Sequence, residues 1–410
     1  AATMRARAVF TNTMPTQAYR SSGRPEVTFA IERLIDAAAD RFGFDRVALR
    51  RRNLVTPDRM PFPNPVGAVY DSGEYETGMD RAMAIADWDG FPARRTEAAS
   101  RGRLAGIGLA NYVESSIGAP RERAEIAVGA DGRVRVVIGT QPSGQGHETS
   151  FAQVVADLLA VPVESVDIVL GDTDIVQAGG GSHSGRSMRH AATVFALAAQ
   201  DLIERGKRIV ADGRFRVPGA QRGFDFLELA DAAARAELPE DLTGGLAVSR
   251  DNEMHDPVFP NGCHVCELEI DTDTGVVTVD RYTAVDDVGT VVNPMIVHGQ
   301  THGGIAQGVG QAMWEQCVID PQSGQPLCGS LMDYAMPRAD RFPDMKTDIA
   351  EVLSPTNPLG IKAGGEGGTT PALAVIVSAV ANALREYGVE EIEMPLTPQK
   401  VWQAIRDAGR

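Results

Sequence analysis

The apolar residues of the chain follow two spacings, and each predicts one kind of element. Helical spacing occurs at residues 26–42 and 371–387, and again after several Gly-rich segments. An apolar residue at every third or fourth position gives a helix one face that can be buried. We therefore expect helices whose apolar stripes consist of Phe29, Ile31, Leu34, Ile35 and Ala38 in the first segment and of Leu373, Val375, Ile376, Val380 and Leu384 in the second.

Strand-like runs lie between these helices. They occur at residues 133–138, 166–170, 264–270 and 276–282, and residues 5–10 resemble them. The segment between the last two internal runs, Asp271-Thr272-Asp273-Thr274-Gly275, is typical of a hairpin turn and lacks the remaining ligands of a calcium loop. The mixture predicts an α/β or α+β fold, with mixed sheets and helices packed on them.

Four polar, Gly-rich segments stand directly before helical runs, at residues 143–149, 179–187, 299–304 and 364–368. We expect each to be a loop that leads to a helix N-terminus, where exposed N–H groups and the helix dipole favour phosphate. Four such loops indicate a large, phosphorylated ligand that is held from several sides. None matches GxxxxGK[ST] or GxGxxG in its proper setting, so a simple nucleotide fold is not expected.

The last of these segments contains a single carboxylate, Glu366, between Gly364-Gly365 and Gly367-Gly368. Glycine lets the backbone approach a ligand closely, at an entropic cost that a plain connection would avoid. Taken alone, the segment fits either a tight turn with an incidental acid or a carboxylate that acts on a bound cofactor. The repetition of Gly-rich loops favours the second interpretation.

Composition and charge limit the classes of function. The chain has 410 residues, 43% of them hydrophobic, which is enough for about two domains. Its net charge of −16 argues against nucleic acid or an anionic membrane surface as a partner. No apolar stretch approaches the roughly 20 residues that span a bilayer, and no signal segment opens the chain, so we expect a cytoplasmic protein. Residues 56–74, rich in Pro and Gly, predict a linker.

The four cysteines do not form a disulfide framework in a chain of this length. Cys263 and Cys266 look like half a zinc site, but residues three apart in a strand point to opposite faces and cannot share a metal. We therefore interpret both as strand cysteines. Cys317 and Cys328 flank a turn sequence, and the sequence identifies no partner for either.

The histidines do not match a metal-binding motif. His147 and His183 lie inside Gly-rich loops, and we interpret them as hydrogen-bond donors to a ligand. His298 and His302 are expected to flank a loop, and they lack the acid of a zinc-protease HExxH motif.

The loops in their order along the chain resemble the C-terminal half of the molybdenum-binding subunit of the xanthine oxidase family of molybdenum hydroxylases. Six motifs carry this resemblance and cover nearly the whole chain. They are Ala18-Tyr19-Arg20-Ser21-Ser22-Gly23-Arg24-Pro25-Glu26, Gly144-Gln145-Gly146-His147-Glu148-Thr149, Gly171-Asp172-Thr173-Asp174, Ser184-Gly185-Arg186-Ser187, Gly299-Gln300 with His302-Gly303-Gly304, and Gly360-Ile361-Lys362 leading to Gly365-Glu366.

The resemblance implies a cofactor that brings its own metal ligands. In this family a pterin chelates molybdenum through dithiolene sulfurs, so no metal-ligating residue is expected in the protein. Bacterial members usually carry the cytosine dinucleotide form of molybdopterin, which fits several phosphate-ready loops. The implied cofactor-binding residues are Arg20, Ser143, Gly144, Gln145, Gly146, Ser184, Gly185, Arg186, Ser187, Gln300 and Gly365.

The resemblance also implies a reaction. Glu366 matches the catalytic glutamate of the family and would act as general base on a molybdenum-bound hydroxyl, with hydride passing to a sulfido ligand. The product would be a hydroxylated aldehyde or N-heterocyclic carbon, with water as oxygen donor. Ser21 and Ser22 are the implied substrate-pocket residues, and the turn 113–116 is a further candidate that equally fits a solvated loop. Related carbon monoxide dehydrogenases carry a cysteine in the loop that holds Ser21-Ser22 here, which argues against CO.

The resemblance implies two domains. Residues 1–68 would be the remainder of a first molybdenum-cofactor-binding domain, and residues 69–410 would form a second. In an alternative interpretation, the second domain divides into two subdomains near residues 220–260. The N-terminal half of the subunit is expected on a separate chain or as a cleavage product. FAD and [2Fe-2S] clusters are expected on partner subunits, because neither pattern occurs here. The isolated chain is therefore expected to be inactive.

Two other functions remain open from the residues. One is a non-catalytic assembly subunit of the same kind of complex, which would not need a carboxylate among glycines. The other is an ATP-binding protein, which would need the Lys and acid that hold phosphates and Mg²⁺.

Overall fold

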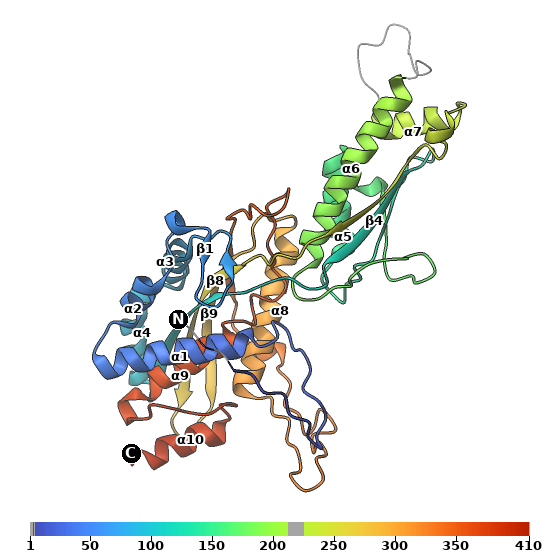
Figure 1. The fold of residues 1–410 in the computed structure, drawn as a ribbon. Coiled ribbons are helices and arrows are strands. Elements are labelled where there is room, and N and C mark those ends of the chain that lie inside the picture. Colours follow the sequence, from blue (N-terminus) through green and yellow to red (C-terminus); the bar gives the residue numbers. More distant parts are fainter. Residues whose placement is uncertain (1–2, 4, 212–224, 410) are drawn as a thin grey trace.

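The structure of the chain is a computed structural model that describes residues 3, 5–211 and 225–409. The chain forms two lobes, each built on one four-stranded sheet (Figure 1). The first lobe comprises residues 19–113 and 259–409, and the second comprises residues 121–253. This mixed α/β architecture confirms the expected fold class. Residues 220–224, where the expected subdomain boundary region begins, lie outside the described residues.

The sheet of the first lobe has the strand order β10-β9-β8-β3, with β10 parallel to β9 and the other pairs antiparallel. Helices cover both of its faces, so β3, β8 and β9 are buried on two sides, whereas the edge strand β10 has no buried residue. The strands are β3 (Arg103–Val113), β8 (Asn261–Asp271), β9 (Val277–Asp287) and β10 (Lys346–Ala350). The helices against one face are α8 (Pro294–Met313), α9 (Ala372–Leu384) and α10 (Pro398–Asp407), and those against the other are α3 (Tyr75–Ala86) and α4 (Phe91–Ser100).

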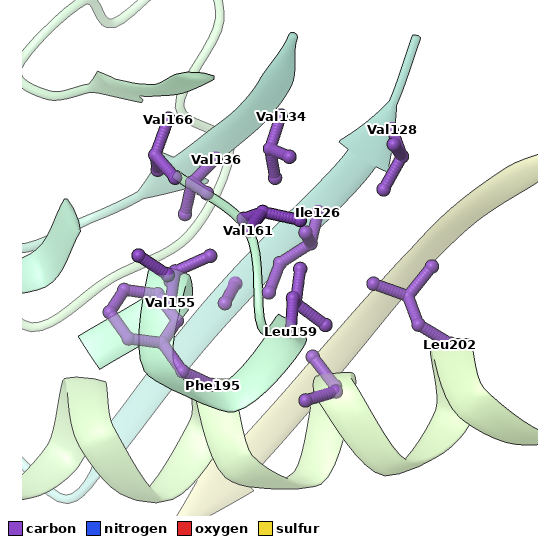
Figure 2. Packing of buried hydrophobic residues seen from close by; sticks show 14 of the residues in the cluster. Ile126, Val128, Val134, Val136, Val155, Leu159, Val161, Val166, Phe195 and Leu202 are labelled. Atoms are coloured by element: carbon purple, nitrogen blue, oxygen red, sulfur yellow. The ribbon is translucent and has the colours of Figure 1, made fainter. Parts of the chain in front are cut away.

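The sheet of the second lobe has the order β6-β5-β4-β7 and carries its helices on one face (Figure 1). Its apolar core lies between sheet and helices, where Phe151 packs edge-on against Phe195 with ring centroids 5.5 Å apart. Figure 2 shows the valines of the sheet pointing toward this core. The strands are β4 (Arg121–Val128), β5 (Val134–Ile138), β6 (Val166–Val169) and β7 (Leu246–Glu253), and the helices are α5 (His147–Leu159), α6 (Ser187–Ala211) and α7 (Phe226–Ala234).

The remaining elements connect to the first lobe. Residues 56–74, expected as a linker, contain a short 3-10 turn and the hairpin of β1 (Phe62–Pro63) and β2 (Val69–Tyr70). The segment is packed, since buried Asp71 accepts a hydrogen bond from Ser354 Oγ at 2.6 Å. Within the described ranges, no helix is long and apolar enough to cross a membrane.

The cysteines follow the strand geometry only in part. Cys263 and Cys266 are both buried in β8 and belong to different apolar clusters on opposite faces of the sheet, which confirms the spacing argument. Cys317 and Cys328, for which the sequence identified no partner, lie with their Sγ atoms 3.8 Å apart. The turn between them brings its two ends together, as the bridge between Ile319 and Pro326 shows.

The prediction of a loop at residues 299–304 is wrong, because this segment lies inside α8. The helix is capped by Asn293, whose side chain accepts a hydrogen bond from the Ile296 N–H, and it extends from Pro294 to Met313. The glycines let α8 pack closely, since a Cβ at Gly304 would lie 2.9 Å from the Gly368 Cα. The expected loop between His298 and His302 is absent for the same reason. Both rings contact Thr347 Oγ1, at 2.8 and 3.3 Å.

Two further predictions near the N-terminus are wrong. Residues 5–10 form no strand and are exposed. Helix α1 (Arg24–Phe42) forms as expected, but Ile31 and Leu34 of its apolar stripe are 51% and 69% exposed. The helix turns a charged face inward instead, toward α2 (Arg46–Asn53), because Glu32 and Asp36 both pair with buried Arg50, at 2.6 and 2.8 Å.

Candidate functional site

A pocket of about 680 Å³ lies between the two lobes. Its walls come from the segment before α1, the loops that precede α5 and α6, the first half of α8 and the Gly-rich segment before α9. The structure thus brings all four segments that were predicted to bind a ligand to one place. The predicted site residues that line the pocket are Arg20, Ser22, Ser143, Gly144, Gln145, Ser184, Gly185, Ser187, Gln300, Gly365 and Glu366.

Arg20 joins three parts of the pocket wall. Its Nε donates to the Gly365 carbonyl at 2.6 Å, and its Nη1 donates to Gln307 Oε1 at 3.0 Å. Its Nη2 donates to both the carbonyl and the side chain of Gln300, each at 3.0 Å. Burial lowers the pKa of Arg20, against the opposing effect of Glu366. Arg20 therefore fixes the glycine segment against α8, and Gln307 is a pocket residue that the sequence did not identify.

Glu366 enters the pocket wall with its two oxygens in different settings. Its Oε1 accepts a hydrogen bond from the Ser21 N–H at 3.1 Å, whereas its Oε2 is buried without a hydrogen-bond partner. Two of the flanking glycines are required by close contacts within the protein and not by a ligand. A Cβ at Gly367 would lie 2.3 Å from the Tyr112 hydroxyl, and one at Gly368 would lie 2.3 Å from the Thr301 carbonyl. Close packing of the segment against β3 and α8 accounts for these two glycines.

The loops before α5 and α6 place two helix N-termini at the pocket. Gly146, with φ of 68°, turns the chain into α5 and touches Ile296 rather than the pocket. Gly144 lies ahead of it with open space where a Cβ would be, and its carbonyl accepts from Gln300 Nε2 at 3.4 Å. At α6, Ser187 Oγ lies 2.8 Å from Ser182 Oγ. Helix ends of this kind bind anionic groups.

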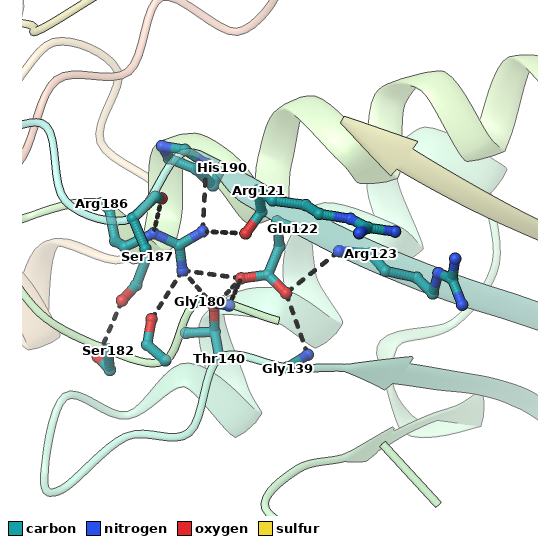
Figure 3. Close-up of polar contacts among 12 residues, drawn as sticks. Arg121, Glu122, Arg123, Gly139, Thr140, Gly180, Ser182, Arg186, Ser187 and His190 are labelled. Atoms are coloured by element: carbon teal, nitrogen blue, oxygen red, sulfur yellow. Dashed lines mark hydrogen bonds and ion pairs between the residues drawn. The ribbon is translucent and has the colours of Figure 1, made fainter. Parts of the chain in front are cut away.

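Arg186 is a predicted cofactor-binding residue that the structure places outside the pocket lining. Its guanidinium pairs with Glu122 Oε2 at 2.8 Å, and both side chains are fully buried (Figure 3). Glu122 also accepts from Thr140 Oγ1 at 2.9 Å and from the N–H groups of Gly139 and Gly180, at 3.2 and 3.4 Å. The pair therefore connects the two loops that precede α5 and α6. Direct contact of the Arg186 guanidinium with a ligand would require this network to break.

Two histidines line the pocket, and His147 is held neutral by burial. Burial lowers the pKa of His147 to about 4, and its ring stacks on Phe151 at 4.7 Å. Its Nδ1 is buried without a hydrogen-bond partner. His183 also lines the pocket, with its Nε2 3.2 Å from the Gly180 carbonyl. Both positions remain consistent with hydrogen bonding to a ligand.

Ser21 and the turn 113–116 lie behind the pocket wall. The Ser21 side chain is buried against Thr370, with the two hydroxyl oxygens 2.8 Å apart, so only Ser22 of the predicted substrate pair lines the pocket. Glu114 and Ser116 are also buried, which makes the interpretation of this turn as a solvated loop wrong. Burial raises the pKa of Glu114 well above its ordinary value, and the neighbouring Glu366 carboxyl group raises it further.

The pocket can hold a large polar ligand. Open space beside Gly144, two helix N-termini and neutral hydrogen-bonding groups such as His147 suit a ligand with phosphates. Glu366 adds a carboxylate to the same wall, and its Oε2 atom is buried without a hydrogen-bond partner. These features fit a cofactor on which a base must act. In the described ranges, no group of three or more His, Cys, Asp or Glu side chains is arranged to hold a metal ion.

Two family models match the chain, and both describe a molybdopterin cofactor-binding domain. One matches residues 81–343 and the other matches residues 1–54. Together they include the loops before α5 and α6, the whole of α8 and the segment that carries Arg20.

Curated relatives and solved structures agree with these matches. The chain is 32% identical to the carbon monoxide dehydrogenase large chain of Hydrogenophaga pseudoflava, over 97% of this chain and 53% of the relative. It is also 32% identical to the nicotine 6-hydroxylase large subunit of Paenarthrobacter nicotinovorans, over 97% of this chain and 52% of the relative. The structure of quinoline 2-oxidoreductase from Pseudomonas putida 86 is similar with a TM-score of 0.88 and 32% identity, covering 95% of this chain and 53% of that one. The chain therefore spans about half the length of the relatives that it matches.

Proposed function

Because the chain belongs to the xanthine oxidase family of molybdenum hydroxylases, we propose that it forms part of a catalytic subunit that hydroxylates an aldehyde or an N-heterocyclic carbon with water as oxygen donor. The observation that carries this proposal is the position of Glu366, which lines the pocket and has one buried oxygen without a partner. A scaffold subunit, the alternative, has no use for such a carboxylate. The burial cost of an unpaired carboxylate oxygen argues for a function that requires it.

The cofactor is molybdopterin carrying molybdenum, in the cytosine dinucleotide form. When bound, it supplies the redox centre that takes up the two electrons removed from the substrate. The open backbone at Gly144 and the helix N-termini of α5 and α6 would hold the pterin and its phosphates. Gln145, Gln300 and Ser187 line the same wall and add hydrogen-bonding side chains.

Glu366 is the general base in this proposal. The Ser21 N–H donates to its Oε1 atom, which orients the carboxylate so that it can accept a proton from the attacking water. Arg20 keeps the glycine segment in place and contributes a positive charge near the carboxylate. Positioning of this kind matters because a base must lie within hydrogen-bonding reach of the proton that it removes.

The substrate class follows from the site and the relatives. Nicotine and quinoline, named for two relatives, are nitrogen heterocycles with electron-poor carbons. The resemblance places a cysteine of carbon monoxide dehydrogenases in the loop that holds Ser21-Ser22 here, which favours an organic substrate over CO.

The active unit contains more than this chain. We propose that residues 1–68 complete a first cofactor-binding domain and that residues 69–410 form a second, with a further division near 220–260. The separate matches at residues 1–54 and 81–343 support the first boundary, and the return of the chain to the first lobe at residues 253–261 supports the second. The N-terminal half of the subunit and subunits with FAD and [2Fe-2S] clusters would complete the complex.

The test is Glu366→Gln in the assembled complex. Turnover is expected to fall by about 10²- to 10⁴-fold, the range for loss of a general base, while the molybdenum content stays at about one per subunit and acid hydrolysis still releases a nucleotide. Glu351→Gln, at an exposed carboxylate outside the pocket, is the control and should turn over normally. Near-normal turnover of Glu366→Gln would remove the base from the mechanism, and molybdenum-free wild-type complex would remove the cofactor.

A further inference from the structure

Glu114 is a buried acid that touches Glu366 from outside the pocket. It follows strand β3, where the chain leaves the first lobe, and its side chain is 1% exposed. It is absent from the pocket lining, so it does not face a ligand directly. Its carboxyl group belongs to the same cluster as that of Glu366, because Arg24 lies 3.9 Å from Glu114 Oε1 and donates to the carbonyl of Ser21, whose N–H donates to Glu366 Oε1. The Glu366 carboxyl group accordingly contributes to the raised pKa of Glu114.

Each of the two carboxyl groups has one oxygen without a hydrogen-bond partner. On each residue, Oε1 has a donor nearby, since Ser116 Oγ lies 3.3 Å from Glu114 Oε1 and the Ser21 N–H lies 3.1 Å from Glu366 Oε1. On each residue, Oε2 is buried without a hydrogen-bond partner. Two ionised carboxylates cannot bond to each other, because both only accept. One proton between them would satisfy both unpaired groups together.

We propose that Glu114 and Glu366 form a carboxyl pair that shares one proton, in which Glu114 is the positioning residue that holds the proton against Glu366. The pair then carries one negative charge in place of two. Carboxyl groups so close cannot both ionise near neutral pH unless cations compensate them. They titrate in two steps that belong to the pair, and not to either residue alone.

The surroundings do not supply enough positive charge to keep both groups ionised. Arg24 of α1 approaches Glu114 Oε1 only to 3.9 Å, and its guanidinium donates to the Ser21 and Ser115 carbonyls. Arg20, before α1, donates its hydrogen bonds to Gly365, Gln300 and Gln307. On β3, the Tyr112 hydroxyl donates to Asp286 at 2.8 Å and is not a cation. Burial accordingly dominates at Glu114 and raises its pKa well above the ordinary value.

The pair has a consequence for catalysis that rests on Glu366 being the base proposed above. A Glu114 carboxyl that donates to one oxygen fixes the rotation of the Glu366 carboxylate and leaves its other side for the reacting proton. At acid pH a second proton would bind to the pair, and Glu366 could then no longer accept a proton from the reaction. Alkali would remove the shared proton, place two charges side by side and disturb the orientation of Glu366.

The pair itself can be tested without turnover, by infrared difference spectroscopy of the purified complex. At neutral pH, wild type minus Glu114→Gln is expected to show one protonated carboxyl band. Glu366→Gln is expected to lower the pH at which this band disappears, because the neighbouring charge that raises the Glu114 pKa has gone. Glu267→Gln, at another buried glutamate, which pairs with Arg94 at 2.8 Å, should leave the band unchanged. The absence of the band, or an unchanged midpoint in Glu366→Gln, would overturn the pair.

Turnover provides the second readout. Glu114→Gln keeps a donor without a titrating proton, so the alkaline fall of kcat is expected to disappear while the acid fall remains. Glu114→Leu removes the donor and should lower kcat more than it changes KM. The kcat of Glu114→Gln should be at least about tenfold higher than that of Glu114→Leu, the factor that 1.4 kcal/mol represents. An alkaline limb that persists in Glu114→Gln would contradict the role. Active Glu366→Gln would instead refute the proposed base, while the infrared result would still decide whether the pair exists.

Discussion

Burial of the Glu114 carboxyl group makes the free energy of unfolding depend on pH, and stability measurements can detect this dependence. In the folded chain its pKa is raised, so the folded state holds this proton at pH values where the unfolded chain has released it. Stability from this group is therefore complete below the ordinary glutamate pKa and is lost as pH rises toward the folded pKa.

We expect the free energy of unfolding to decrease with rising pH by at most about 1.4 kcal/mol per unit from this group. Urea unfolding at a series of pH values measures the slope. Glu114→Gln does not titrate and should show a shallower decline over the same range. Equal slopes in wild type and variant would mean that Glu114 ionises in the folded chain as readily as in the unfolded one.

Residue-level prediction from the sequence succeeded where the chemistry is local. A carboxylate among glycines and the arginine that follows Tyr19 both stand out in the sequence, and both line the pocket. Glu122 did not stand out, because only the fold shows that it is buried against Arg186. Glu114 appeared only as part of a turn of undecided exposure, since the burial of an acid depends on elements distant in sequence.

At the scale of elements, the glycines of α8 have a structural meaning that loop prediction missed. Gly304 and Gly308 lie on the face of α8 that meets the segment leading to α9, and Cβ atoms there would approach Gly368 Cα to 2.9 Å and Ala372 Cβ to 2.4 Å. Glycine normally weakens a helix interior, and here it permits close packing. Periodicity was a good guide for α5, α6 and α9, whose apolar stripes face the cores, and a poor one where small residues make the contact.

The close packing of α8 predicts a difference between two glycine substitutions on the same helix. Gly308→Ala is expected to destabilise the chain by about 1–3 kcal/mol, because its methyl group would overlap Ala372. Gly299→Ala has open space for its methyl group and should be neutral or stabilising by up to about 1 kcal/mol through helix propensity. Denaturant unfolding of both variants compares them. If Gly308→Ala is as stable as Gly299→Ala, the contact between α8 and α9 is looser than described.

At the scale of the whole molecule, α1 presents an apolar surface with no covering element in the described chain. Val27, Ile31 and Leu34 are 58%, 51% and 69% exposed on one side of the helix, while Glu32 and Asp36 face inward. The apolar periodicity of α1 was therefore real, but only part of its stripe meets the core: Phe29 packs against it, whereas Ile31 and Leu34 face away. An exposed apolar helix face of this kind is typical of a surface that another chain covers.

We expect the proposed N-terminal half of the subunit to bind this surface. Ile31→Asp combined with Leu34→Asp should weaken association with the N-terminal half by at least about tenfold, since a charge would replace buried apolar area at two positions. Co-purification of the two halves, quantified by titration, measures the loss. Glu26→Lys, at an exposed position on the same helix, is the control for charge alone. Full association of the double variant would place the partner elsewhere.

Because the pocket lies between two lobes, a ligand bound in it would hold the lobes together. The chain crosses between the lobes only near residues 113–121 and 253–261 in its described part, and the pocket wall draws on both lobes. A ligand that touches both sides acts as a cross-link, and its binding free energy opposes the separation of the lobes in proportion to the logarithm of its concentration over Kd. Insertion of the proposed cofactor would therefore also be an assembly step, because it would join two separately folded cores.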